Sequence, residues 1–140
     1  MTQASQYVVF KLSDEYYAIN IEGVENIEKI INITRVPKTP SYVKGVINMR
    51  GEIVPIIDLR ARLNLNSKEY DDETRIIINK TADLMIGFIV DSTYEVIEIN
   101  QSEIETKVNE NKNLETYVSG IAKNNGRMII LLDMAKILDI

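Results

Sequence analysis

Residues 42–65 read YVKGVINMRGEIVPIIDLRARLNL, and residues 117–140 read YVSGIAKNNGRMIILLDMAKILDI. The two stretches align without a gap and keep their apolar positions. A repeated unit of this length predicts two similar subdomains. Positions where the copies differ are therefore the first places to look for function. The identical pairs are Tyr42/Tyr117, Val43/Val118, Gly45/Gly120, Gly51/Gly126, Asp58/Asp133 and Leu63/Leu138.

Each copy has the pattern of a hairpin followed by a short helix. An apolar run leads to a glycine, Gly51 or Gly126, which suits a tight turn with positive φ. A second apolar run then leads to Asp58 or Asp133, at the place where a helix N-cap is expected. Capping, rather than catalysis, is the interpretation that this context favours for both aspartates.

Composition restricts the function classes. The chain of 140 residues is 45% hydrophobic, and isoleucine and valine make up about a quarter of it, which favours strands. Cysteine and histidine are absent from the sequence. Disulfides, thiolate zinc sites, cysteine nucleophiles and the usual neutral-pH general base are therefore excluded. The formal net charge of −5 argues against a nucleic-acid partner.

Short β-prone segments alternate with turn signals along the rest of the chain. Residues 21–29 are ambiguous, with the spacing of a short amphipathic helix. Polar residues 64–72 predict a solvated loop, residues 106–116 predict a mobile loop, and a last helix is expected from Met134. Outside the repeat, strands are expected at residues 7–12, 16–20, 30–35, 74–79, 84–90 and 95–99, with the segment 95–99 at a sheet edge.

The strand pattern predicts an all-β fold of small antiparallel barrels. A single eight-stranded barrel is compatible with the spacing, but the internal repeat favours two smaller barrels. Residues 1–6 lack the apolar core of a signal peptide, and no apolar run approaches the ~20 residues that span a bilayer. A cytoplasmic protein is the expectation.

No catalytic or metal motif is apparent. Phosphate-binding glycine loops and the GxSxG nucleophile motif are absent from the sequence. Asp71 and Asp72 lie in the polar segment, where a metal role is improbable, and Asp91 is interpreted as a turn residue at a strand end rather than as a paired carboxylate. A carboxylate-based hydrolase would need two acids meeting in a pocket. We expect no enzymatic activity, no cofactor and no metal.

The copies differ most usefully at the hairpin turn. Arg50 precedes Gly51 in the first copy, and Asn125 stands at its place in the second. Turn geometry therefore does not require the guanidinium. An arginine on a rigid hairpin suits a carboxylate or an interface hot spot, and a solvated arginine or an internal salt bridge is equally compatible with the sequence.

The segment from Pro40 to Arg60, centred on Asn48-Met49-Arg50-Gly51, resembles the signature of the CheW-type chemotaxis coupling proteins. Further similarity lies at residues 17–21, 87–91, 117–120 and 131–133, and together it covers about residues 7–138. No kinase or phosphotransfer portion is present, so the chain is similar to the free-standing coupling protein rather than to the kinase that carries the same module.

This resemblance implies two SH3-like five-stranded barrels and a few short helices in one domain over residues 7–140. The approximate subdomains are 16–80, and 81–140 together with the strand 7–13. It implies a non-enzymatic adaptor that couples chemoreceptors to the chemotaxis histidine kinase and supports array assembly. The implied partners are the regulatory domain of the kinase and the cytoplasmic hairpin tip of the receptors, so the protein would join membrane receptor arrays through its partners without inserting into the membrane.

The resemblance also implies a partner-binding region around the first hairpin. Where the family often has an acidic residue, this chain has Asn26, so Glu25 or Glu28 is the candidate for an ion pair with Arg50. An adaptor of a related two-component pathway and a small-ligand-binding β-barrel are alternative functions. The predicted partner-binding residues are Arg50, Gly45, Val24, Asn26, Asn48 and Gly87.

Overall fold

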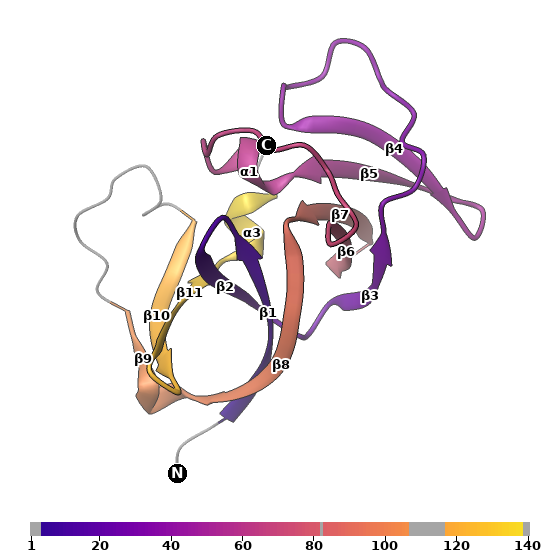
Figure 1. Ribbon diagram of the computed structural model, residues 1–140. Coiled ribbons are helices and arrows are strands. Elements are labelled where there is room, and N and C mark those ends of the chain that lie inside the picture. Colours follow the sequence, from indigo (N-terminus) through magenta and orange to yellow (C-terminus); the bar gives the residue numbers. More distant parts are fainter. Residues whose placement is uncertain (1–3, 82, 107–116, 139–140) are drawn as a thin grey trace. The chain divides into compact units, whose positions relative to one another are not determined.

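The computed structural model describes residues 4–81, 83–106 and 117–138. Most of the loop predicted at 106–116 lies outside this range. No helix among the described residues is long and apolar enough to cross a membrane. The elements are β1 (Ala4–Leu12), β2 (Glu15–Asn20), β3 (Val24–Lys29), β4 (Val43–Met49), β5 (Glu52–Asp58), α1 (Leu59–Arg62), β6 (Arg75–Thr81), β7 (Leu84–Val90), β8 (Ser92–Asn100), the 3₁₀ turn η1 (Gln101–Glu103), β9 (Ile104–Glu105), β10 (Val118–Asn124), β11 (Arg127–Leu132) and α3 (Met134–Ile137) (Figure 1).

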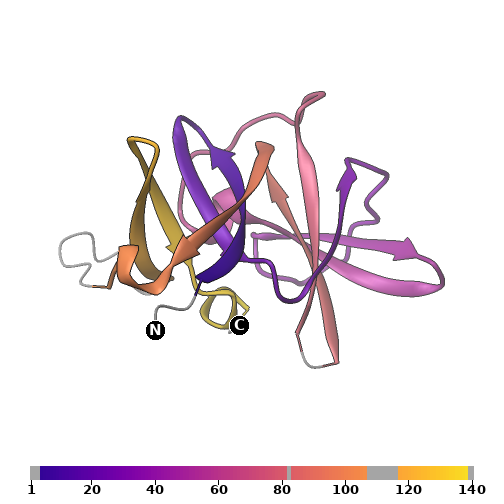
Figure 2. The same cartoon turned by 90° about the horizontal axis from the view of Figure 1, so that it is seen from below.

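The chain divides into two compact units, each built on one twisted sheet (Figures 1 and 2). Unit 1 comprises Met1–Ile21 and Thr93–Ile140, and its sheet has the strand order β8-β1-β2-β11-β10-β9. Unit 2 comprises Glu22–Ser92, with the order β3-β6-β7-β5-β4. The predicted all-β class with two sheet-based subdomains is confirmed, and the single-barrel alternative is not.

The two repeat copies form equivalent hairpins. Strands β4 and β10 share the same alternation of buried and exposed positions, because both pack one face inward. Both hairpins have a register shift at the same place, just before Gly45 and just before Gly120. Asp58 and Asp133 cap the following helices α1 and α3, as predicted: each carboxylate accepts a backbone N–H two residues on.

The equivalence extends beyond the sequence repeat. In unit 2, β7 lies antiparallel to β6 and parallel to β5. In unit 1, β2 lies antiparallel to β1 and parallel to β11 in the corresponding way. The β1–β2 hairpin at the start of the chain therefore completes the sheet of the second repeat copy, as the β6–β7 hairpin completes that of the first.

Each sheet has its own aliphatic cluster. In unit 1 the cluster is Val9, Ala18, Ile99, Ala122, Ile129 and Leu131. In unit 2 it is Ile47, Val54, Ile56, Ile76, Ile78 and Ile89. Both clusters draw on the repeat hairpin and on its completing hairpin, so burial of apolar surface joins segments that are distant in sequence.

Two segments differ from expectation. Residues 21–29 contain no helix; β3 forms there because its backbone pairs antiparallel with β6, which overrides the helical spacing. Of the strand expected at residues 30–35, only an isolated bridge between Thr34 and Val46 forms.

The boundaries between the two units fall at Glu22 and Ser92 rather than near residues 16 and 80. The reason is that β2 pairs with β1 and β11, while β7 pairs with β5 and β6.

Candidate functional site

Arg50 occupies the tip of the hairpin between β4 and β5. Met49 pairs with Glu52, so Arg50 and Gly51 are the two turn residues, with φ angles of 53° and 85°. Two positive φ values are typical of a type I′ turn, in which asparagine followed by glycine is strongly preferred. A residue with a long side chain is uncommon in this left-handed conformation, so turn geometry does not explain why arginine is present.

The side chain of Asn48 stabilises the turn between β4 and β5. Asn48 is exposed, and its Oδ1 accepts a hydrogen bond of 3.1 Å from the backbone N–H of Gly51. This contact fixes the closing residue of the turn and with it the direction in which Arg50 leaves the backbone. Asn48 therefore has a structural part in the hairpin in addition to any contact with a partner.

Arg50 and Asn26 line one cavity of about 230 Å³ within unit 2. The Asn26 side-chain amide donates to Glu28 Oε2. Neither Glu25 nor Glu28 forms the expected ion pair, and within the part of the chain that the structure describes no carboxylate lies within ion-pair distance of Arg50. The guanidinium thus remains available for an external anion. The other lining residues are Glu25, Met49, Glu52, Lys80 and Met85.

The other predicted residues fall into two groups. Val24 is half-buried at the start of β3, two residues before Asn26, and is not among the residues that line the cavity. Gly45 and Gly87 are buried within β4 and β7 and present no side chain to a partner. The structure therefore brings Arg50 and Asn26 to one cavity, although β3 and β4 are the opposite edge strands of their sheet. Asn48 supports the turn, Val24 lies on β3, and the two glycines lie in the interior.

Packing explains both glycines. Gly45 has φ of 144°, and a Cβ atom there would collide with the backbone carbonyl of Thr34. Gly87 lies opposite Ile56 and Ile78 in the sheet, and a Cβ atom would come within 2.7 Å of the Ile56 side chain. Packing thus accounts for glycine at both positions, and the partner-binding role of Gly87 stays a prediction.

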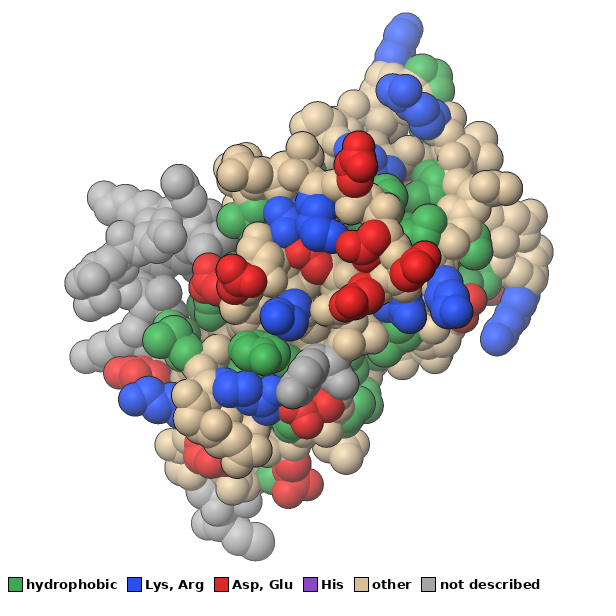
Figure 3. Space-filling model, in the orientation of Figure 1, with side chains coloured by type: hydrophobic (Ala, Val, Ile, Leu, Met, Phe, Trp, Pro, Cys, Tyr) green, Lys and Arg blue, Asp and Glu red, His purple; other side chains and the backbone are tan. Residues whose placement is uncertain are grey.

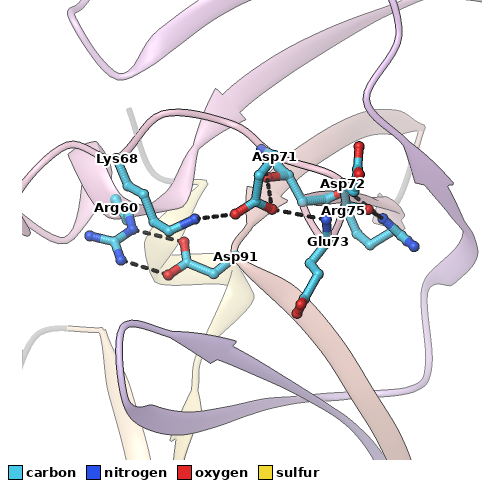
Figure 4. Close-up of polar contacts among 8 residues, drawn as sticks. Arg60, Lys68, Asp71, Asp72, Glu73, Arg75 and Asp91 are labelled. Carbon is cyan, nitrogen blue, oxygen red and sulfur yellow. Dashed lines mark hydrogen bonds and ion pairs between the residues drawn. The ribbon is translucent and has the colours of Figure 1, made fainter.

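The sequence did not reveal a buried ion pair behind the hairpin. Arg60, 8% exposed, donates from Nε to Asp91 Oδ1 at 2.8 Å and from Nη2 to Asp91 Oδ2 at 2.6 Å (Figure 4). Its Nη1 donates to the backbone carbonyl of Asn66. The interpretation of Asp91 as a turn residue alone was wrong, because the parallel pairing of β5 with β7 brings the start of α1 beside the end of β7. Because the pairing of β5 with β7 is not marked by any local sequence pattern, the Arg60–Asp91 ion pair could not be predicted from the sequence.

Asp58 connects the same region to the segment 64–72. Its Oδ1 accepts from the backbone N–H of Arg60, and its Oδ2 accepts from the Tyr70 hydroxyl at 3.0 Å. Partial burial, with the Asp58 carboxylate beside it, raises the pKa of the Tyr70 hydroxyl well above its usual range, so the hydroxyl remains a donor. The predicted solvated loop is confirmed, because residue 64 and residues 66–72 are exposed and the segment forms no helix or strand; Asn66 and Tyr70 anchor it to the rest of unit 2.

An exposed ion pair lies within the segment 64–72. Lys68 Nζ lies 2.9 Å from Asp71 Oδ2 (Figure 4). This hydrogen bond lowers the pKa of Asp71 and raises the pKa of Lys68. Asp71 also accepts the backbone N–H of Glu73, so it organises a turn before β6. Among the described residues, no group of three or more acidic, histidine or cysteine side chains is arranged to hold a metal ion.

Comparison with known proteins places this geometry in a family. The CheW-like domain family model matches residues 6–140. Chemotaxis protein CheW of Bacillus subtilis is 41% identical over 133 residues, covering 94% of this chain and 85% of the relative. Chemotaxis protein CheW of Helicobacter pylori is 39% identical over 136 residues, covering 95% of this chain and 81% of the relative.

A solved structure agrees with the sequence comparison. The scaffolding protein TtCheW from Thermoanaerobacter tengcongensis has a TM-score of 0.91 and 34% identity, with 99% of this chain and 94% of that chain covered. These relatives carry the names of chemotaxis and scaffolding proteins, which support the role of a non-enzymatic chemotaxis adaptor. The chain belongs to the CheW-like domain family.

Proposed function

We propose that this adaptor couples chemoreceptors to the chemotaxis histidine kinase, using the first hairpin as its main contact. The proposed partners are the regulatory domain of the kinase and the cytoplasmic hairpin tip of the receptors. Through them the protein would act in the cytoplasm at membrane-bound receptor arrays.

The observation that carries the proposal is the difference between two turns with the same backbone. Arg50 and Asn125 both have φ of 53°, and each is followed by a glycine with positive φ. Asparagine is the residue that this turn favours, so the arginine in the first copy is retained for a reason other than folding. Among the described residues it has no acidic partner within ion-pair distance, which leaves its planar fork of donors for a carboxylate on another protein.

The surroundings of Arg50 suit an interface contact. Met49 and Met85 supply flexible apolar surface beside the cavity, while Glu25, Glu52 and Lys80 supply charge. Apolar centres with charged rims are typical of reversible protein interfaces. Val24 and Asn26 extend this surface along β3, and Asn48 fixes the turn that presents it.

The test is reconstitution with a receptor signalling fragment and the kinase. We expect a ternary complex and a raised kinase rate with the unmodified chain. Arg50→Ala should lower complex formation about tenfold, as loss of a central interface arginine does, while its unfolding transition stays in place. The matched control is Asn125→Ala, which alters the equivalent turn of the second copy.

Three results would contradict the proposal. A folded chain that binds neither partner would remove the coupling function. Equal binding by Arg50→Ala and the unmodified chain would remove Arg50 from the interface. Chemical-shift changes on adding a receptor hairpin fragment or the kinase domain that avoid β3 and the β4–β5 hairpin would move the interface elsewhere.

A further inference from the structure

A second cavity in unit 2 lies under the loop between β3 and β4, away from the Arg50 turn at the other end of β4. It has a volume of about 600 Å³, within the usual range of binding pockets, about 300–1,000 Å³. Its positive side chains are Arg35, Lys38 and Lys44, and no aspartate or glutamate is among its lining residues, all of which the structure describes. In a chain of net charge −5, this is a local reversal of sign.

These cations are exposed and have no acidic partner of their own. Arg35, Lys38 and Lys44 are all solvent-exposed, and within residues 4–81, 83–106 and 117–138 none of them forms an ion pair. Figure 3 shows Lys and Arg side chains at the outer end of the loop between β3 and β4. Their field is therefore directed to solvent rather than neutralised inside the protein.

The loop that carries Arg35 and Lys38, and leads to Lys44 in β4, is held in shape. Thr39 Oγ1 donates to the carbonyl of Val36 at 3.1 Å, and the backbone N–H of Val43 donates to the carbonyl of Pro40. Lys38 has φ of 61° at the tip of this turn, and Pro37 and Pro40 fix φ on either side. A preformed loop lowers the entropy cost of binding.

The remaining walls are apolar and aromatic. Val36 is 39% exposed and Tyr70 is 41% exposed, and both line the cavity. The hydrogen bond from the Tyr70 hydroxyl to Asp58 Oδ2 holds this ring in place. A small inorganic anion would leave these apolar walls uncovered, whereas a peptide with acidic and apolar side chains would cover both kinds of surface.

We propose that this basic cavity, defined by Arg35, Lys38, Lys44, Val36 and Tyr70, binds an acidic peptide segment that carries apolar side chains. The site is separate from the Arg50 hairpin and does not depend on the coupling function. A nucleic acid is disfavoured, because the chain is acidic overall and the cavity offers a single aromatic ring for stacking.

The probe is a fluorescent synthetic peptide that alternates glutamate and leucine, with a matched peptide in which glutamine replaces glutamate. Fluorescence anisotropy with the full chain should show binding of the acidic peptide that weakens as salt is added, and no binding of the glutamine peptide. The double variant Lys38→Glu/Lys44→Glu should reduce the affinity at least about fivefold. Amide chemical-shift changes should centre on residues 35–44.

The control variant is Lys29→Glu/Lys123→Glu, which changes the net charge by the same amount at two exposed lysines outside the cavity. It should bind the acidic peptide nearly as well as the unmodified chain. Equal losses in the two double variants would show a general charge effect and overturn the site. Tighter binding of tripolyphosphate or single-stranded DNA than of the peptide at the same residues would overturn the assignment of its ligand.

Discussion

The first and second repeat hairpins share a backbone and differ in what surrounds it. Both have a register shift, a two-residue turn with positive φ and an aspartate cap at the end. The first hairpin carries Arg50 where the second carries Asn125, and it adds the Arg60–Asp91 pair and the Tyr70–Asp58 hydrogen bond. Features common to both hairpins thus indicate what the fold requires. Features found in the first hairpin alone indicate additional roles, such as partner binding or local stabilisation.

Substitution of the equivalent buried glycines, Gly45 and Gly120, should give the largest difference in stability between the two copies. Gly45→Ala should lower the free energy of unfolding by about 3 kcal/mol, because alanine at φ of 144° is strained and its Cβ meets the rigid carbonyl of Thr34. Gly120→Ala should cost less, about 2 kcal/mol, because its φ is not in the left-handed region and its Cβ would meet the Ile104 Cγ2 at 2.6 Å and the carbonyl oxygen of Glu105 only at 3.1 Å. Urea unfolding measures both. Equal losses would show that the strands impose the same strain in both copies.

The ion pair specific to the first copy should give the next effect. Arg60→Ala should lower stability by about 2 kcal/mol, since it removes the two hydrogen bonds that the guanidinium donates to the Asp91 carboxylate, which is 15% exposed. Ala135 stands at the equivalent place in the second helix, so the helix itself tolerates alanine. A double-mutant cycle with Asp91→Asn isolates the pair. Additive losses would mean that the two side chains do not interact in solution.

The two caps provide a closer comparison. Asp133→Ala should cost about 1 kcal/mol, the usual value for a lost N-cap. Asp58→Ala should cost about 2 kcal/mol, because it removes the cap and the acceptor for the Tyr70 hydroxyl as well. If both variants unfold at the same urea concentration, the tie between Asp58 and the segment 64–72 contributes nothing measurable.

The Tyr70 hydroxyl of the first copy should give a smaller effect, a dependence of the free energy of unfolding on alkaline pH. The folded-state pKa of Tyr70 is raised, so its contribution is complete below the unfolded pKa, about 10, and is lost as pH rises above it. Stability of the unmodified chain should therefore fall more steeply above this pH than that of Tyr70→Phe. Urea unfolding at a series of alkaline pH values measures the two slopes. Parallel slopes would show that Tyr70 titrates alike in the folded and unfolded chain.

The sequence predicted the parts of the fold that rest on local pattern. The repeat hairpins, their glycine turns, both aspartate caps and the β6–β7 hairpin follow from periodicity and turn chemistry. The helical spacing of residues 21–29 was misleading, because β3 is set by its pairing with the distant β6. The family resemblance implied that the strand at residues 7–13 joins the second copy, but the place of β2 there is non-local and no local signal marks it.

The candidate site was predictable only in outline. Arg50 was found because an internal copy offered a residue-by-residue comparison. The meeting of Asn26 and Arg50 at one cavity, from opposite ends of the sheet, depends on tertiary structure that the sequence does not specify. The pairing of Arg60 with Asp91 depends in the same way on the pairing of β5 with β7. The interior position of Gly87 was missed because a glycine in a strand can indicate either close packing or a contact surface.

The most direct test of the central claim exchanges the two turn residues. The claim is that Arg50 serves partner binding and is not needed for folding. Arg50→Asn should leave the free energy of unfolding within about 0.5 kcal/mol, or raise it slightly, while lowering ternary-complex formation with the receptor fragment and the kinase about tenfold, as Arg50→Ala does. Asn125→Arg is the control and should not rescue binding when combined with it. Normal complex formation by Arg50→Asn, or a loss of stability large enough to account for lost binding, would contradict the claim.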